Sequence, residues 1–284
     1  MNKIYIILIA CLIFIGGNSV AYPQDSLYGG FSNPPASAKA RTWWHWVDGN
    51  ITKEGITTDL EAMKRVGIQE AQIFNVSQSL PQGPAIYLSD HWLDLLQFAA
   101  QEADRLGMEI AFNNAAGWSN SGGPWVTPEY AMQTVVYSEV KLEGKKTFKG
   151  QLPLPPSRLD YYVDIAVLAF PTPEKNQRIT DLALKSLSGQ TFPKHLEPDD
   201  QLIDKSAIIR KDQIVNLTSR LSADGQLEWE VPAGNWTILR VGHTPTGAEN
   251  RPAVLGGKGL VCVKMSRKGV DNFWNGGVQP ILDR

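Results

Sequence analysis

Residues Arg65 to Asn75 read RVGIQEAQIFN, and residues Arg105 to Asn113 read RLGMEIAFN, so one pattern occurs twice. In each copy, a segment whose apolar residues recur at helical spacing ends at a glycine. A short apolar segment that ends in asparagine follows. A helix that stops at glycine and leads into a buried strand is the repeating unit of a parallel sheet with right-handed crossovers. The two copies therefore predict an α/β fold.

The segments around this repeat extend it to the order strand, helix, strand, helix, strand. Aromatic residues bounded by turn residues predict a first strand over residues 41–47. Apolar residues at helical spacing predict helices after Thr52 and after the capping residue Ser89. A doubly wound sheet and a (β/α)8 barrel both fit this order. Neither a Gly-rich phosphate loop nor a P-loop follows any strand, which disfavours a nucleotide-binding sheet.

After Trp125 the pattern changes from alternating helices and strands to strands with little else. Thr127, Pro128 and Glu129 predict the start of a brief helix, and residues 181–187 predict another. Short strand-like runs punctuated by glycine and proline predict an antiparallel, β-sandwich-like insert over residues 132–246. The runs are QTVVYSEVKL, DYYVDIAVLAF, IVNLT, GQLEWEVP and GNWTILRVGHT.

The fold class that follows is α/β, an incomplete (β/α)8 barrel holding its first three strands, interrupted by this insert. We expect residues 41–131 to be the first βαβαβ part and residues 247–284 to be a Gly-rich, irregular return segment. Three parallel strands would leave a sheet edge and apolar faces exposed. We therefore expect the front part of a larger barrel rather than a small open α/β domain.

The first residues predict export to the periplasm or the extracellular space. Lys3, a short apolar run and the triplet ending at Ala21 are typical of a signal peptide over residues 1–21. The run is too short to span a bilayer. The alternative is a lipoprotein with its lipid on Cys11. A Pro-, Ser- and Gly-rich stretch, residues 22–40, predicts an irregular lead-in, and cleavage would leave Cys262 without a disulfide partner in the chain.

Composition favours a carbohydrate as the partner. The formal net charge is −2 and no long run of one charge occurs, which argues against nucleic acid and anionic membranes. No later segment is long and apolar enough to be transmembrane, and nothing in the sequence indicates an oligomeric state. Nine tryptophans are present, and indole rings stack on the C–H faces of sugars, although packing in a core is their commoner use.

Short polar side chains follow all three predicted parallel strands. Because the carboxyl ends of parallel strands meet at one edge, these side chains are candidates for one pocket mouth that binds sugar hydroxyls. The alternative is that they form turns, for which Asp and Asn are common. The candidates are Asp48, Asn50, Asn75, Asn113 and Asn114.

Alternation along the first strand divides its aromatic residues between two faces. Trp44 and Trp46 share one face, which we expect to be core under the helices. His45 shares the other face with Trp43 and Val47, and lies near the exit of the strand, where sites in such folds are built. A silent core histidine is the alternative for His45.

The loop AGWSNSGGPW after the third strand is a further candidate. Two glycines and a proline shape it, and Trp118 and Trp125 bracket it. These indoles predict either a platform for stacking a sugar or a rigid seal over the core.

Several catalytic motifs are missing from the sequence. It has no H-E-x-x-H, no cysteine cluster, no Asp-rich calcium loop and no G-x-S-x-G. A glycosidase normally needs two carboxyl groups that flank the scissile bond. Among the strand exits only Asp48 has one, since Glu70 and Glu109 begin strands. Three further glutamates are interpreted as surface groups: Glu228, Glu230 and Glu249.

Three blocks resemble glycoside hydrolase family 106, the bacterial α-L-rhamnosidases. The blocks are WWHWVDGNITKEGITTDLEAMKRVGIQEAQIFNV, AQEADRLGMEIAFNNAAGWSNSGGPW, and TGAENRPA together with GKGLVCVKMS. The resemblance implies a (β/α)8 catalytic domain interrupted by β structure, inverting release of terminal L-rhamnose, and calcium in the site. It also implies a longer protein, with catalytic glutamates beyond Arg284.

The resemblance transfers no catalytic residue to this chain, but it does transfer a binding rim: His45, Asp48, Asn50, Asn113, Asn114 and Trp118. Val261 and Val263 stand where the family pattern has acidic residues, and Asp48 stands where it has Asn. If the acidic residues contact metal or sugar, an altered substrate or weakened activity follows. A non-catalytic carbohydrate-binding or remnant protein is the competing interpretation, because the chain lacks an acid pair.

Overall fold

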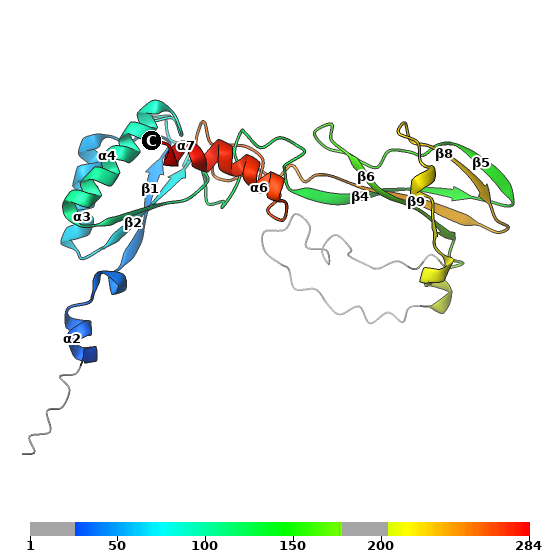
Figure 1. Cartoon of the computed structure of the whole chain (residues 1–284), viewed down its shortest axis with the longest axis horizontal. Coiled ribbons are helices and arrows are strands. Elements are labelled where there is room, and N and C mark those ends of the chain that lie inside the picture. Colours follow the sequence, from blue (N-terminus) through cyan, green and yellow to red (C-terminus); the bar gives the residue numbers. More distant parts are fainter. Residues whose placement is uncertain (1–25, 176, 178–203) are drawn as a thin grey trace, which may run out of the picture.

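The computed structural model describes residues 26–175, 177 and 204–284, and Figure 1 shows two parts that follow one another along the long axis. Helices pack on a parallel sheet in one part, and long antiparallel strands form the other. Within the described ranges, no helix has the length and apolarity needed to cross a bilayer. The predicted signal peptide (residues 1–21) and the predicted helix at residues 181–187 lie outside the described residues.

The α/β part is built on a three-stranded parallel sheet in the order β1-β2-β3. Its strands are β1 (Arg41–Val47), β2 (Glu70–Val76) and β3 (Glu109–Phe112). β1 and β2 pair along their whole length, and Val47 lies opposite Val76 at the carboxyl end. The loops after β1 and β2 therefore leave the sheet at one level, and β3 ends at the same edge with Phe112 opposite Ile73. We call this edge the rim.

Two helices cover one face of this sheet, and local signals in the sequence set their ends. α3 (Lys53–Arg65) begins where the Thr52 hydroxyl accepts a hydrogen bond from the Gly55 amide at 3.0 Å. α4 (Asp90–Leu106) begins in the same way at Ser89 and ends at Gly107, whose φ of 61° is left-handed. Both helices occur where the sequence predicted them.

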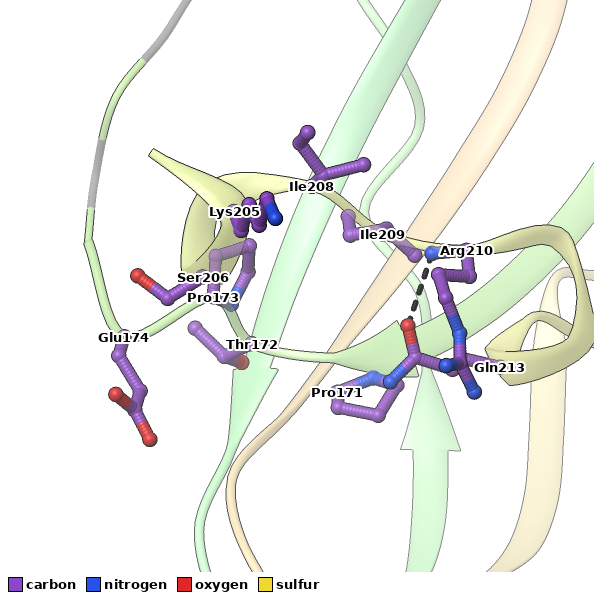
Figure 2. Close-up of a pocket in the computed structure, with 10 residues that line it drawn as sticks. All are labelled: Pro171, Thr172, Pro173, Glu174, Lys205, Ser206, Ile208, Ile209, Arg210 and Gln213. Carbon is purple, nitrogen blue, oxygen red and sulfur yellow. Dashed lines mark hydrogen bonds between the residues drawn. The ribbon is translucent and has the colours of Figure 1, made fainter. Parts of the chain in front are cut away.

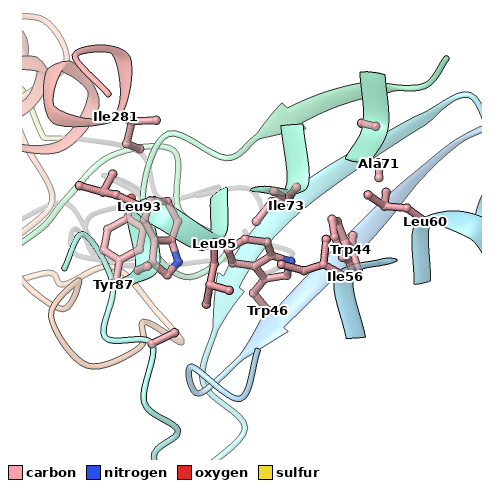
Figure 3. Packing of buried hydrophobic residues seen from close by; sticks show 14 of the residues in the cluster. Trp44, Trp46, Ile56, Leu60, Ala71, Ile73, Tyr87, Leu93, Leu95 and Ile281 are labelled. Carbon is pink, nitrogen blue, oxygen red and sulfur yellow. The ribbon is translucent and has the colours of Figure 1, made fainter. Parts of the chain in front are cut away.

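The core of the α/β part lies between the sheet and these helices. Trp44 and Trp46 of β1 are buried there against Ile56, Leu60 and other apolar residues (Figure 3). The Trp44 indole N–H also donates to Asp59 Oδ2 at 2.9 Å. Trp43 and His45 lie on the opposite face and are exposed, so the predicted division of the first strand is confirmed.

The second part contains two antiparallel sheets that share one buried apolar cluster. The orders are β4-β9-β6-β7 and β5-β8. Leu142 and Ile238 from the first sheet and Leu227 and Trp229 from the second belong to the shared cluster. The barrel and the sandwich stay predictions. The strands are β4 (Gln133–Leu142), β5 (Lys146–Gln151), β6 (Val163–Pro171), β7 (Val215–Asn216), β8 (Gln226–Val231) and β9 (Trp236–Pro245).

The return segment differs from the prediction, because residues 267–282 are helical rather than irregular. They form α6 (Arg267–Phe273), a π-helical turn η5 (Trp274–Val278) and α7 (Gln279–Leu282). The α7 residue Ile281 joins the core of the α/β part (Figure 3). A side chain at Gly276 or Gly277 would overlap the Trp125 ring, so these glycines permit close packing that favours a helix here.

Three smaller expectations were also wrong. The lead-in contains the short helix α2 (Ser26–Ser32) and a 3-10 turn η1 (Ala36–Ala38). Residues 127–130 form a turn, with the Tyr130 amide donating to the Thr127 carbonyl at 3.0 Å, and no helix starts there. β5 was missed, because its sequence KTFKGQ is mostly polar and half-exposed.

We expect Trp44→Ala to lower the free energy of unfolding by about 3–5 kcal/mol, because it leaves a large cavity in the core. Trp43→Ala is the matched control. Trp43 is 63% exposed against 6% for Trp44, so its removal should cost less than about 1 kcal/mol. Urea unfolding of both variants measures the difference. Equal losses would contradict the assignment of the two faces.

We expect residues 41–125 to show no sharp cooperative melt when produced alone. Val254 and Ile281, which belong to the same core, would be absent. The glycines that cover Trp125 would be absent too. Thermal unfolding followed by circular dichroism, with the whole chain as the reference, tests this. A steep transition in the fragment would show that the return segment is not needed for its core.

Candidate functional site

The rim consists of the loops that follow β1, β2 and β3, and of residues 247–262, which lie across them. The Ser77 amide donates to the Pro252 carbonyl at 3.0 Å, and the Gly123 amide donates to the Leu260 carbonyl at 3.3 Å. The return segment thus contacts the loops after β2 and β3 through its backbone. All eight predicted binding residues lie on the rim or next to it.

Asp48, at the exit of β1, is buried and binds the backbone of the next loop. Its Oδ2 accepts hydrogen bonds from the Gln78 and Leu80 amides, both at 2.9 Å. Burial acts to raise the pKa of Asp48, but hydrogen bonds from the Ser77 hydroxyl and from these two amides outweigh it and hold the pKa below its ordinary value. The carboxylate therefore fixes the loop after β2 to the end of β1.

Asn50 and Asn75 also direct their side chains to protein groups. The Asn50 Nδ2 donates to the Pro81 carbonyl at 3.0 Å. Asn75 is buried, and its Oδ1 accepts from the Trp92 indole N–H at 2.8 Å. Turn and packing roles, which the sequence left open beside sugar binding, account for the contacts that both side chains make.

Asn113 and Asn114 are neighbours with different environments. The Asn113 Nδ2 lies within 3.0 Å of the carbonyls of Ala115, Gly117 and Ser119, so it gathers the loop after β3 around itself. Asn114 is exposed. Of the two, Asn114 has the side chain that a ligand at the rim can reach.

Asn250 is a rim residue that the sequence did not single out. Its side chain is fully buried, with Nδ2 donating to the Ala116 and Gly257 carbonyls and Oδ1 accepting from the Gly259 amide, all within 2.9 Å. It therefore joins the loop after β3 to residues 257–259 of the return segment. The block TGAENRPA contained it, but nothing in that block marked Asn250 as buried.

The two tryptophans of the loop after β3 have opposite roles. Trp125 is half-buried and packs against glycines of the return segment, which corresponds to the predicted seal over the core. Trp118 is 60% exposed although its backbone is fixed, with the Trp118 amide donating to the Arg251 carbonyl at 3.1 Å. An exposed indole on a fixed backbone suits the predicted stacking platform.

The uncovered face of the parallel sheet carries a small aromatic group next to the rim. Phe74 of β2 lies between its neighbours on β1, with ring centroids 5.0 Å from Trp43 and 5.9 Å from His45. His45 is exposed, and neither of its ring nitrogens hydrogen-bonds to another of the described residues. The face could receive either further protein or a ligand.

Several charged groups at the rim lie on the return segment. Glu249 is half-buried, and its carboxylate lies 3.2 Å from Lys258 Nζ and 3.9 Å from an Arg251 nitrogen. The expectation that Glu249 is a plain surface group was therefore incomplete. Val261 and Val263 are half-buried and hydrogen-bond through their backbones to Ala248 and Tyr130.

Two cavities are relevant to the choice of site. One of about 690 Å³ lies at the end of β6 in the antiparallel part, lined by residues such as Pro171, Lys205 and Arg210 (Figure 2). A smaller one of about 240 Å³ lies beside β1 and α3, at the unpaired edge of the parallel sheet, and includes His45 and Asn50. Only the smaller cavity contains predicted site residues.

A metal site is not assembled by the residues that the structure describes, among which no three His, Cys, Asp or Glu side chains are grouped. The rim carboxylates Asp48 and Glu249 are engaged with backbone amides and with Lys258. These side chains alone do not fit the calcium that the family resemblance implies, since calcium takes six to eight oxygen ligands.

Comparisons with known proteins define the class of this chain as glycoside hydrolase. A family model described as alpha-L-rhamnosidase, glycoside hydrolase family 106, matches residues 32–284. The chain belongs to this family, so the resemblance drawn from the sequence is confirmed.

The individual proteins to which the chain is similar include a relative from Formosa agariphila and a rhamnosidase of known structure. It is 57% identical over 268 residues to a Formosa agariphila protein named "Putative beta-glucuronidase", covering 94% of this chain and 23% of that protein. A solved structure of a rhamnosidase from Novosphingobium sp. PP1Y matches with a TM-score of 0.73 and 26% identity, covering 90% of this chain and 38% of that one. The chain thus spans well under half the length of either relative.

We expect Asp48→Asn to destabilise the protein at neutral pH, because a neutral amide accepts the two backbone hydrogen bonds less strongly than a carboxylate does. The folded-state pKa of Asp48 lies below the ordinary value of 3.8, so the stabilisation is present above that pH. It is lost as the pH falls through the lowered pKa. Urea unfolding of both proteins at pH 7 and in acid should therefore show a difference that shrinks in acid. A difference independent of pH would refute the role of the charge.

Proposed function

We propose that the chain is the N-terminal part of an exported, periplasmic or extracellular α-L-rhamnosidase that removes terminal L-rhamnose from glycans by inverting hydrolysis. Three parallel strands with helices on one face would be the first third of a (β/α)8 barrel. The antiparallel part would be an insert between the third strand and the rest of that barrel. The family match over residues 32–284 is the observation that carries the proposal.

The uncovered sheet face supports the barrel. In a closed barrel, one face of each strand lies under the helices and the other faces inward. Trp44 and Trp46 occupy the helix-covered face, while Trp43 and His45 are exposed on the other. The unpaired edge of β1 is where the last strand of a closed barrel would pair. His45 would then face the interior near the sugar.

The acid and base of the reaction would come from a later part of the enzyme. Inverting glycosidases hold two carboxyl groups about 6.5–9.5 Å apart across the scissile bond. Asp48 and Glu249, the described carboxylates engaged at the rim, are bound to protein partners. The rim residues of this chain would bind and orient the sugar: Asn114 and Trp118 by direct contact, and Asp48, Asn50, Asn75, Asn113 and Trp125 by holding the loops. Calcium, if the family's metal is present, would need ligands from the later part as well.

The named relative supplies a second substrate candidate. Its name refers to a glucuronide rather than a rhamnoside, at an identity of 57%. L-Rhamnose and D-glucuronic acid differ in ring stereochemistry and also in the C5 substituent, which is a methyl group in rhamnose and a carboxylate in glucuronic acid. A hydrolase of either kind would use the same pair of carboxyl groups, so the sugar is decided by contacts at the rim.

We expect the full-length enzyme, with this chain as its N-terminal part, to release rhamnose from an aryl α-L-rhamnoside. The 284-residue chain alone should release none, because general acid–base catalysis alone contributes about 10²–10⁴-fold to the rate. His45→Ala in the full-length enzyme should lower the rate and leave the melting temperature unchanged. Trp44→Ala, its neighbour on the buried face, should instead lower the melting temperature.

Comparing the rhamnoside with an aryl β-D-glucuronide separates the two substrates. Faster cleavage of the glucuronide would replace rhamnose by glucuronic acid in the proposal. Cleavage of neither sugar by a folded full-length protein would favour a non-catalytic carbohydrate-binding role. Rhamnose release by the 284-residue chain would show that the acid and base lie within it.

A further inference from the structure

Two of the most exposed large side chains on the rim, Trp118 and Arg251, are on adjacent backbones. The Trp118 amide donates to the Arg251 carbonyl at 3.1 Å, and the Arg251 amide donates to the Ser119 hydroxyl at 3.3 Å. The indole is 60% exposed and the Arg251 side chain is 78% exposed. An indole and a guanidinium, both mostly in solvent, thus extend from adjacent backbones.

The backbone beneath them is fixed from several sides. The Gly117 amide donates to the Asn75 carbonyl at 2.7 Å, and the Asn113 side chain holds the carbonyls of Gly117 and Ser119. Asn250, next to Arg251, is buried and makes three hydrogen bonds to backbone groups. An exposed aromatic on a fixed backbone loses little entropy when it binds a ligand. This arrangement suits recognition better than it suits packing.

The charges around the two residues do not cancel. Lys258 is the closer partner of Glu249, at 3.2 Å, and Arg251 lies at 3.9 Å with most of its side chain in solvent. One carboxylate therefore faces two cations, and the guanidinium of Arg251 keeps donors free for a ligand. Guanidinium groups bind carboxylates and sulfate-like oxyanions through paired hydrogen bonds.

We infer that Trp118 and Arg251 form a subsite for an anionic sugar residue, with the indole stacked on the pyranose ring and the guanidinium bound to its acidic group. Lys258 holds Glu249 away from this group and adds positive charge. The acidic group is a uronate carboxylate or a sulfate ester, which present the same oxygen chemistry to arginine. The inference rests on the proposed function, since it assumes that the rim faces a glycan. The anionic sugar unit bound by Trp118 and Arg251 would be a neighbour of the cleaved sugar in the glycan or a unit farther along it.

The test is binding of three monosaccharide probes to the 284-residue chain: methyl β-D-glucuronide, glucose 6-sulfate and neutral methyl β-D-glucoside. The indole N–H signals of the nine tryptophans are followed by nuclear magnetic resonance. The signal missing from Trp118→Phe identifies Trp118. We expect at least one anionic probe to shift it at a concentration about tenfold lower than the neutral probe requires, since hydrogen bonds to charged groups are worth about 1.5–3 kcal/mol.

Two variants with opposite expected effects make the test specific. Arg251→Gln should remove the preference for the anion, whereas Glu249→Gln should strengthen anion binding severalfold because a competing carboxylate is lost. Arg267→Gln, on the exposed face of α6 and 93% exposed, is the matched control and should change nothing. Whichever anion binds more tightly identifies the acidic group as carboxylate or sulfate.

Equal binding of all three probes, no shift with any of them, or an anion preference that survives Arg251→Gln would each overturn the subsite. The measurement needs no turnover. Its failure would therefore remove the anionic subsite and leave the proposed hydrolase to be decided by release of rhamnose from the full-length enzyme.

Discussion

The buried side chain of Asn250 holds together segments of chain that are far apart in sequence. A primary amide has two donors and an acceptor, and here all of them are used on backbone groups of two different loops. Because the site is closed to water, loss of any of these bonds would leave a buried polar group unsatisfied. The shape of the rim therefore depends on a residue that no ligand can touch. Trp118 and Arg251 are positioned through their backbones, which leaves most of both side chains in solvent.

Close packing explains why the end of the return segment is helical. Residues 267–282 pack against the α/β part, and Ile281 belongs to its buried core. Trp125 lies against Gly276 and Gly277, which allow the closest approach of a helix to an indole. Close packing thus overrides the low helix propensity of paired glycines. The Gly-Gly pair suggested a loop in the sequence because the contact with the Trp125 ring is visible only in the structure.

Local signals were enough to predict the α/β part but not the details of its site. Alternation in β1, the caps at Thr52 and Ser89, and the stop at Gly107 act within a few residues, so the sequence displays them directly. By contrast, Asp48 and Asn75 look like candidate ligands because they are polar and end strands. Their actual partners, the amides of residues 78 and 80 and the indole of Trp92, are set by tertiary contacts. The exposure of Trp118 and the partial burial of Trp125 also depend on such contacts. β5 was missed for the same reason, because its polar residues form a strand only against β8.

The antiparallel part leaves and re-enters the α/β part at neighbouring points. The Thr246 amide donates to the Met132 carbonyl at 2.8 Å, and β4 and β9 pair from Gln133 opposite Pro245 to Leu142 opposite Trp236. The two strands act as a stem that holds the ends of the insert together. More than a hundred residues separate the two points where the chain leaves and re-enters the α/β part. Bringing the ends of a loop together costs entropy that grows with the free length between them. Because β4 and β9 already hold these ends together, the α/β part bears only the cost of a short connection. The part of the insert between β4 and β9 can therefore change in size without changing the order in which the parallel strands assemble.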